Sequence, residues 1–265
     1  MRQAWPAGSS VLTGCNARAR VPPRPLALIL SGFPSGLAPI APRPPTGRGG
    51  KVDFTDLRFS KKSYFPTLIF QIELPQPEEL NKQLLAAIYA QQERDQKGIE
   101  RSNITALGGW HSHNDLHKVP EFAEISHLVI EATRRIAEDQ GYDKRFGMKI
   151  GTMWSIINPP GSANRAHVHP GCLWSGVYYI HAPEKAGSIE FIEPRTAHLM
   201  NQPRFSPNAK RAKENWTKVR FEPKPGRMII FPSWLYHAVD TNESTETGRA
   251  GHRVIISFNL NQTKL

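Results

Sequence analysis

The spacing of hydrophobic and polar positions changes along the chain near Gly141. Before this residue, apolar positions recur with helical spacing over residues 75–94 and 120–140, which predicts two amphipathic helices. Beyond it, short β-rich segments are separated by turn residues, which predicts strands, and one more strand is expected over residues 64–74. The predicted helical stripes are Leu80, Leu84, Leu85 and Ile88, and Phe122, Ile125, Val129, Ile130 and Ile136. The later strands are expected over residues 149–158, 173–182, 188–192, 218–222, 227–231, 237–240 and 253–259.

This order of elements favours one fold class. Helices come first and many short strands follow, which is typical of an α+β domain in which N-terminal helices buttress a β-barrel or sandwich. Gly141 fits the C-terminal cap of the second helix. A chain of 265 residues is long enough for one domain of this kind with a substantial core.

The first 50 residues have a different character. They hold nine prolines and many Gly, Ser and Arg residues without any helical or strand period. Three interpretations stay open for this leader, which we place at residues 1–52: a disordered tail, a targeting peptide, or an upstream start. The prolines would break the amphipathic helix that a targeting peptide needs. The folded domain is expected over residues 53–265.

The net charge of +11 is unevenly distributed. Residues 1–52 contain six arginines and one lysine and no acidic residue, so they carry +7 and the rest carries 11 − 7 = +4. Nucleic-acid binding needs a clustered basic face on a folded domain, so this function class is not favoured. No apolar run approaches the length of a membrane span. With two cysteines, Cys15 and Cys172, there is no disulfide framework, which favours a reducing, cytoplasmic location.

Three histidines are the candidate metal ligands in the strand-rich half of the chain. His167 and His169 are one residue apart, so their side chains point to the same side of an extended segment. His237 lies 237 − 169 = 68 residues further on, so only tertiary folding can bring it to them. Two close imidazoles and a distant third can hold non-haem iron in a facial site with open positions. The pattern points to an iron-dependent oxygenase on a double-stranded β-helix, a jelly-roll or cupin-like core.

Arg253 opens the last predicted strand, and Ser257 and Asn259 share its face. A guanidinium that points into a barrel needs an anion, and a co-substrate carboxylate bound by two hydrogen bonds would supply it. Tyr179 or Tyr178 can donate a phenolic hydrogen bond to the same region, and only one of the two can face inward.

Residues from about 63 to 261 resemble the 2-oxoglutarate–Fe(II) oxygenases, in the branch of that superfamily that includes the prolyl hydroxylases. The motifs that carry the resemblance are Asn164-Arg-Ala-His167-Val-His169-Pro170, Ser175-Gly-Val-Tyr-Tyr179, Gly226…Phe231-Pro-Ser-Trp-Leu…His237 and Arg253…Ser257-Phe-Asn259, with Gly109-Trp-His-Ser112 and Trp154-Ser-Ile-Ile-Asn158 upstream.

The resemblance implies a double-stranded β-helix from about residue 149 and a dioxygenase activity. Such an enzyme couples oxidative decarboxylation of 2-oxoglutarate to succinate with hydroxylation of a substrate, here a small molecule or a polypeptide. It implies Fe(II) on His167 and His237, O₂ as co-substrate and ascorbate as a reductant. It also implies that Arg253 binds the far carboxylate of 2-oxoglutarate.

Two positions depart from the pattern of that family. The family normally has His-x-Asp, and His169 stands at the position of the aspartate. His169 is then either a substitute third ligand, which removes one negative charge from the site, or no ligand at all, which leaves another position open. Ile255 stands where the family has the serine of an Arg-x-Ser pair, so Ser257 is the candidate that replaces it beside Tyr179.

Several other histidine, cysteine and tryptophan residues are expected in loops or in the core and not in the metal site. His113-Asn-Asp115 is a literal His-x-Asp, but it precedes a helix and not a core strand, so we reject it as the metal motif. The neighbouring His111 and His117 are expected in a polar loop that rims the pocket. Cys172 is expected to be a buried thiol, and the remaining core candidates are Trp154, Trp174 and Trp234.

The basic stretch 204–220 and the metal motif leave alternatives open. The basic residues of the stretch fit either a solvated loop or a lid that contacts an anionic substrate or nucleic acid. A cupin-type enzyme or sensor without 2-oxoglutarate is the alternative function, although Leu173 and Trp174 occupy the places of the expected acidic ligand. A third possibility is a metal-free β-helix that binds nucleic acid.

Overall fold

The computed structural model describes residues 58–102 and 109–265. Contacts group residues 62–265 into one compact unit, which holds all the described helices and strands. The predicted leader, residues 1–52, lies outside the described residues. Within the described residues, no helix has both the length and the apolar character needed to cross a membrane.

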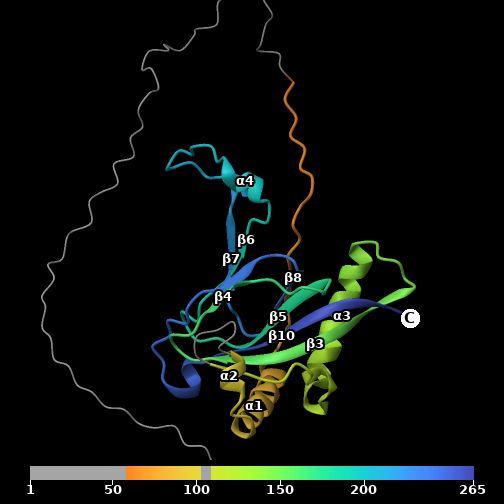
Figure 1. Cartoon of the computed structure of the whole chain (residues 1–265), viewed down its shortest axis with the longest axis vertical. Coiled ribbons are helices and arrows are strands. Elements are labelled where there is room, and N and C mark those ends of the chain that lie inside the picture. The colour runs from red at the N-terminus through yellow and green to blue at the C-terminus, as the bar shows by residue number, and fades with distance from the viewer. Residues whose placement is uncertain (1–57, 103–108) are drawn as a thin grey trace, which may run out of the picture. The chain divides into compact units, whose positions relative to one another are not determined.

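Ten strands in the described residues form two antiparallel sheets (Figure 1). The six-stranded sheet has the order β1-β8-β5-β10-β3-β2, and the four-stranded sheet has the order β4-β9-β6-β7. Together they confirm the expected double-stranded β-helix. The strands are β1 (Phe70–Glu73), β2 (Trp110–His111), β3 (Phe146–Asn158), β4 (Asn164–His167), β5 (Trp174–His181), β6 (Ile189–Ile192), β7 (Lys218–Phe221), β8 (Arg227–Pro232), β9 (His237–Val239) and β10 (Arg253–Lys264).

Two helices of 17 residues cover one face of the six-stranded sheet. In Figure 1, α1 lies below β3 and β10, and strands of the four-stranded sheet lie above them. The helices are α1 (Glu78–Arg94), α2 (Gly98–Ser102), α3 (Ala123–Asp139) and α4 (Thr196–Met200), with 3₁₀ turns η2 (Leu116–Lys118), η3 (Pro120–Phe122), η4 (Lys213–Asn215) and η5 (Gly248–Gly251).

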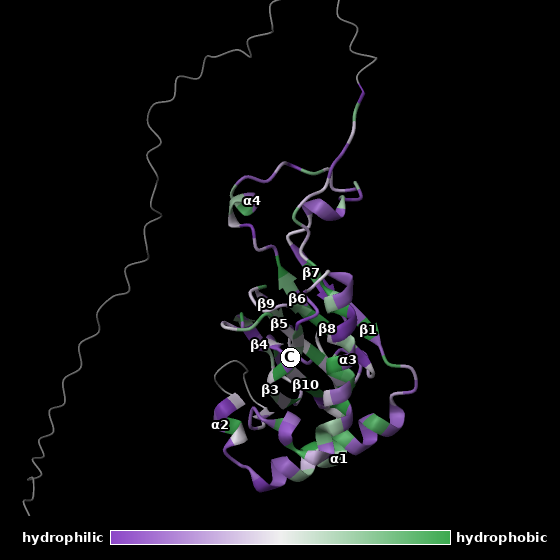
Figure 2. Ribbon diagram, turned by 90° about the vertical axis from the view of Figure 1, so that its right-hand side faces the viewer, coloured by the Kyte–Doolittle hydropathy of each residue, from purple (hydrophilic) through white to green (hydrophobic). Residues whose placement is uncertain are grey.

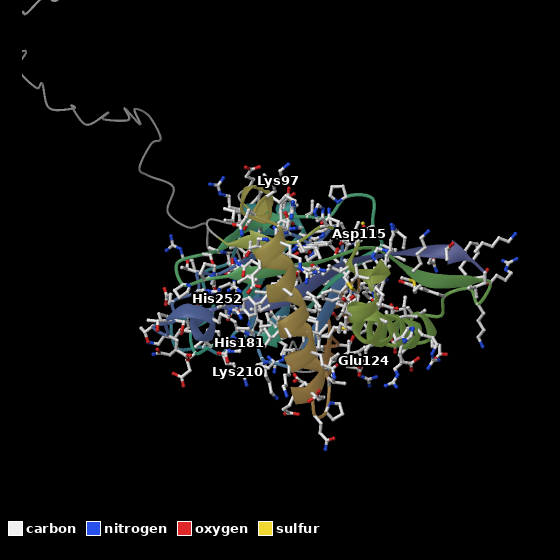
Figure 3. All side chains as sticks on the ribbon, turned by 90° about the horizontal axis from the view of Figure 1, so that it is seen from below. Lys97, Asp115, Glu124, His181, Lys210 and His252 are labelled. Atoms are coloured by element: carbon white, nitrogen blue, oxygen red, sulfur yellow. The ribbon has the colours of Figure 1, made fainter. Side chains whose placement is uncertain are left out.

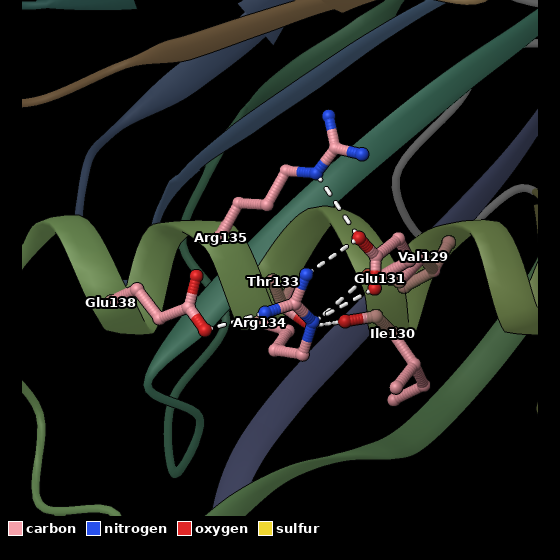
Figure 4. Close-up of polar contacts among 7 residues, drawn as sticks. All are labelled: Val129, Ile130, Glu131, Thr133, Arg134, Arg135 and Glu138. Atoms are coloured by element: carbon pink, nitrogen blue, oxygen red, sulfur yellow. Dashed lines mark hydrogen bonds and ion pairs between the residues drawn. The ribbon is translucent and has the colours of Figure 1, made fainter.

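The apolar stripe of α3 is buried as predicted, with Phe122, Ile125 and Val129 fully covered by the sheet. The opposite face of the helix carries ion pairs (Figure 4), because Arg134 and Arg135 donate to Glu131 at 2.9 and 3.1 Å. Gly141 ends the helix with φ +66°, which confirms its expected role as a C-terminal cap.

Alternation along β10 divides the molecule into layers. Val254, Ile256, Phe258 and Leu260 belong to the core beneath the helices. Ile255 belongs to a second core between the two sheets, whose other fully buried members are Ile156, Val177, Tyr179, Ile189, Phe191, Ile229, Phe231 and Leu235. Apolar residues therefore line both faces of the central strands. Figure 2 colours the ribbon by the hydropathy of each residue.

The predicted strand over residues 64–74 is longer than the observed one. β1 spans only Phe70–Glu73, which pair with four residues of β8. Phe65 has φ +59° and precedes a proline, so the chain turns before it can pair. In contrast, β3 and β10 extend beyond their predicted limits, because they pair with each other as far as Phe146 and Lys264.

Candidate metal centre

Two paired strands bring the three histidines together. His167 ends β4 and His237 begins β9, and the two residues are direct partners across that pair. His169 follows β4 and is fixed by its backbone N–H, which donates to the carbonyl of Ser233 at 2.9 Å. One ligand nitrogen from each imidazole lies within 4.8 Å of the other two. The ring centroids are 4.3 to 5.1 Å apart.

Each of these imidazoles has an oxygen partner at Nδ1. His167 Nδ1 lies 2.7 Å from the carbonyl oxygen of Arg165, and His237 Nδ1 lies 2.9 Å from that of Leu235. His169 Nδ1 lies 2.7 Å from the side-chain oxygen of Asn259. Carbonyl oxygens accept hydrogen bonds, so Nδ1 carries the hydrogen in each ring and Nε2 keeps its lone pair.

Burial keeps two of these rings neutral. Burial, together with the neighbouring His167, lowers the pKa of His169 to about 4 and that of His237 to about 3. Neutral imidazoles are the form that binds a metal cation.

The residues present fit a divalent metal. His169 Nε2 is buried and has no hydrogen-bond partner in the described part of the chain, so an interior lone pair is left for an ion. Imidazole ligands suit iron among other transition metals, and three ligands on one side leave coordination positions open.

A cavity of about 370 Å³ extends from the histidines to Arg253. It lies between the two sheets and is large enough for a small organic acid. Its apolar wall is made of Ile156, Val177, Ile189, Phe231 and Ile255.

Arg253 is 1% exposed and points into this cavity. Its Nη1 donates to the carbonyl oxygens of Ala186, Gly187 and Asp240. Its Nη2 is buried without a partner. Burial lowers the pKa of Arg253 to about 10, so the side chain is still charged at pH 7. The free edge of a buried guanidinium is the group expected to bind a carboxylate.

The two neighbouring tyrosines face opposite sides of β5. Tyr179 lines the cavity, and burial raises its pKa to about 12, so its hydroxyl keeps its proton and can donate. Tyr178 faces α1, where its hydroxyl donates to Asn81 at 2.8 Å. Ser257 also lines the cavity, on the same face of β10 as Arg253.

Sequence reasoning gave no role to two residues that contact the histidine cluster. Asn259 was expected on the face of Arg253, but its contact with His169 was not. Trp154 was expected in the core, yet it is half-buried and stacks on His169 with ring centroids 5.7 Å apart. His111 stacks on the other face of Trp154 and lines the cavity, as expected of a rim residue.

Other histidines lie away from the cluster. His113 is largely exposed and lies 3.5 Å from Asp95, so the literal His-x-Asp does not join the cavity. Figure 3 labels His181 and His252 beside α1. His181 Nδ1 lies 2.7 Å from the carbonyl oxygen of His252, whose own Nδ1 lies 3.0 Å from the hydroxyl of Tyr89 on that helix.

Two burial predictions near the site are wrong. Trp234 is 55% exposed, because it lies in the turn between β8 and β9 and not in a strand. Cys172 is only partly buried, since it precedes β5 in a turn. Trp174 is buried as expected.

A family model matches the strand-rich part of the chain. Residues 152–259 match the family model described as "Putative 2OG-Fe(II) oxygenase". This region belongs to the 2OG-Fe(II) oxygenase family. Family members use Fe(II), 2-oxoglutarate and O₂, so the chain is an oxygenase of the iron- and 2-oxoglutarate-dependent type. Among curated proteins, none matches the sequence.

A solved structure with TM-score 0.50 shares the fold. The chain is similar to the non-haem α-ketoglutarate-dependent epimerase SnoN from nogalamycin biosynthesis, with TM-score 0.50 and 10% identity over 72% of this chain and 75% of that one. A prolyl-4-hydroxylase of Pseudomonas putida has TM-score 0.47 and 15% identity, over 73% of this chain and 92% of that one.

The acidic ligand of a cupin has no counterpart in this 2OG-Fe(II) oxygenase. Of the two residues at its place, Trp174 points away from the cavity, where its indole donates to the hydroxyl of Tyr142 at 3.1 Å. Leu173 precedes β5 and is 37% exposed.

Proposed function

We propose that this 2OG-Fe(II) oxygenase binds Fe(II) through Nε2 of His167, His169 and His237 and hydroxylates its substrate. The observation that carries the proposal is the convergence of three imidazoles whose Nδ1 atoms are all occupied by oxygen partners. Iron bound there would supply the O₂ chemistry that couples decarboxylation of 2-oxoglutarate, to succinate and CO₂, with oxidation of the substrate. Ascorbate would serve as a reductant.

Arg253 would orient the co-substrate. Its unpartnered Nη2 is the donor for the far carboxylate of 2-oxoglutarate, and Tyr179 and Ser257 supply hydroxyl groups in the same cavity. The three carbonyls that hold Nη1 leave the guanidinium little freedom, so the binding edge is preorganised. The apolar wall of the cavity excludes water from the reacting groups.

The substrate would approach over the strand ends beside His237. Tyr236 is 53% exposed there, and its carbonyl accepts a hydrogen bond from Ile192 at the end of β6. Trp234 is exposed in the same turn. Exposed aromatic side chains at the mouth of a buried site favour a substrate with apolar groups, either a small molecule or a polypeptide.

A nucleic-acid substrate is the second candidate, carried by the segment between β6 and β7. Residues 193–217 contain five arginines and lysines and two glutamates, so they carry 5 − 2 = +3. Retention of the protein on single-stranded nucleic acid that weakens steeply with salt would support it. Retention that is absent at low salt would exclude it.

We also propose a cytoplasmic location. Its support is the scarcity of cysteine and the partly buried free thiol of Cys172, which would be exposed to oxidation elsewhere. Fractionation of cells that produce the full chain would test it, and recovery in a secreted fraction would contradict it.

The function is tested by anaerobic titration of the full chain with Fe(II) and 2-oxoglutarate. A visible charge-transfer band is expected when both are present, and it should vanish in His237→Ala. Release of succinate and CO₂ under O₂ should follow the same dependence. Iron binding without a band would exclude 2-oxoglutarate as the co-substrate, and no iron binding would exclude the metal site itself.

A further inference from the structure

The Nδ1 atom of His169 is hydrogen-bonded to a neutral side chain. This nitrogen lies 2.7 Å from the amide oxygen of Asn259, a group without net charge. The Nε2 atom of His169 is buried and has no hydrogen-bond partner among the described residues. One ring nitrogen of His169 lies within 4.8 Å of the ligand nitrogens of His167 and His237. The orientation of one amide therefore decides which nitrogen of His169 faces the other two imidazoles.

Asn259 is itself fixed from both sides. Thr152 of β3 and Ser175 of β5 are its direct cross-strand partners in the six-stranded sheet. The hydroxyl of Ser175 donates to the amide oxygen at 2.7 Å, and the amide nitrogen donates to the hydroxyl of Thr152 at 3.0 Å. We call this row Thr152–Asn259–Ser175 the amide row. Asn259 is 9% exposed and Ser175 is fully buried, so water competes little for these bonds.

We propose that Asn259 is the positioning residue of His169: through the amide row it selects the tautomer that carries hydrogen on Nδ1, and so presents Nε2 to the metal. The proposal rests on the proposed function, because it assigns the metal to these histidines. The tautomer itself, however, is a property of the metal-free protein.

The chemistry of the two ligand types explains why such a row is needed. A carboxylate at position 169 could offer either of two equivalent oxygens to a metal. An imidazole has two different nitrogens and can rotate its ring, so it binds productively only when the other nitrogen is held. An amide oxygen supplies the acceptor without adding a charge to the site. The amide row is therefore needed because position 169 holds a histidine and not a carboxylate.

The first test observes the tautomer directly. Nitrogen-15 NMR of the metal-free full chain, with His169→Gln to assign the signals, should show hydrogen on Nδ1 of His169. In Asn259→Ala the signals should move toward a mixture of tautomers, and in Asn259→Asp the Nδ1–H form should persist, because a carboxylate also accepts. Hydrogen on Nε2 in the wild-type protein would overturn the proposal without any variant being needed.

The second test measures metal affinity with Co(II), whose absorption also reports coordination geometry. Loss of a group that orients a metal-binding histidine typically weakens binding about 10- to 100-fold. Asn259→Ala should show a loss in this range and a changed Co(II) spectrum, and Asn259→Asp should restore both. Unchanged affinity and an unchanged spectrum in a folded Asn259→Ala would overturn the proposal.

Asn261→Ala is the matched control. Asn261 lies on the same strand, and its side-chain oxygen also accepts one hydrogen bond, from the backbone of Leu173 at 3.1 Å. It does not line the cavity, so its loss should leave the Co(II) spectrum unchanged. If the wild-type chain binds no divalent metal, the proposed function fails, whereas the NMR comparison of wild type and Asn259→Ala still decides the role of Asn259.

Discussion

Replacing Arg253 by lysine is expected to weaken 2-oxoglutarate binding strongly. Arg253 is 1% exposed, and one edge of its guanidinium is already committed to three backbone carbonyls. Lysine keeps the positive charge, but its single ammonium group cannot donate hydrogen bonds to these carbonyls and to a carboxylate at the same time. Losing one partner of a buried, hydrogen-bonded charge pair costs about 2–5 kcal/mol. This corresponds to an increase in Kd of about 30-fold to several thousand-fold.

The assay is the anaerobic titration of the iron-loaded full chain with 2-oxoglutarate, followed by the charge-transfer band. Tyr179→Phe should raise the Kd about fivefold, because one neutral hydrogen bond contributes about 1 kcal/mol. Tyr178→Phe is the matched control, since that hydroxyl bonds to Asn81 on the helix side. It should lower stability by about 1 kcal/mol and leave the Kd unchanged.

A wild-type Kd in Arg253→Lys would refute this reasoning. The carboxylate would then bind elsewhere, and the unpartnered nitrogen of Arg253 would need another explanation. Thermal unfolding of the same samples shows whether a loss of binding is only a loss of folded protein. Iron binding without 2-oxoglutarate gives a second check, because Arg253 lies on another strand from the three histidines.

Three further predictions concern stability. Burial holds the pKa of His169 at about 4 and that of His237 at about 3, below the ordinary 6.5, so the unfolded chain binds more protons than the folded one between pH 7 and 5. The free energy of unfolding of the metal-free protein should therefore fall by about 2 kcal/mol per histidine from pH 7 to 5. Urea unfolding measures this change, and a free energy that does not vary with pH would contradict it. Gly176→Ala places a Cβ 2.3 Å from the ring of Phe258 and should lower stability by about 1–3 kcal/mol in the same assay, with partial recovery when Phe258→Leu is added. Glu131→Gln removes a carboxylate whose pKa its arginine partners lower to about 2, yet the pairs are exposed, so the melting temperature should change little, and not at all in high salt.

The fold was predictable where one periodicity dominated. The stripe of Val129 and its neighbours on α3, and the alternation along β10, each depend on local spacing that a single sequence shows directly. β1 was predicted too long, because apolar residues alone do not show where pairing begins, and pairing with β8 begins only at Phe70. Trp234 was misplaced for a related reason: its size suggested the core, whereas the turn after β8 exposes it.

The candidate site was predictable in its residues and not in its contacts. His167, His237 and Arg253 could be selected from residue type and position alone. The choice between Tyr178 and Tyr179 could not, because it depends on which face of β5 meets α1. The partnership of Asn259 with His169 spans 90 residues and needs the register of three strands, which no local pattern contains.

The position of β10 in its sheet has a consequence for how the protein is made. β10 follows every other described strand in the chain, yet it lies between β5 and β3, inside the six-stranded sheet. A nascent chain that has been translated only as far as His252 therefore has two unpaired strand edges facing a gap, and it lacks Arg253 and Asn259. Unpaired edges associate with other chains. Chains stalled or cleaved just before β10 should thus be the aggregation-prone species, and the cavity can close only after β10 has been synthesised.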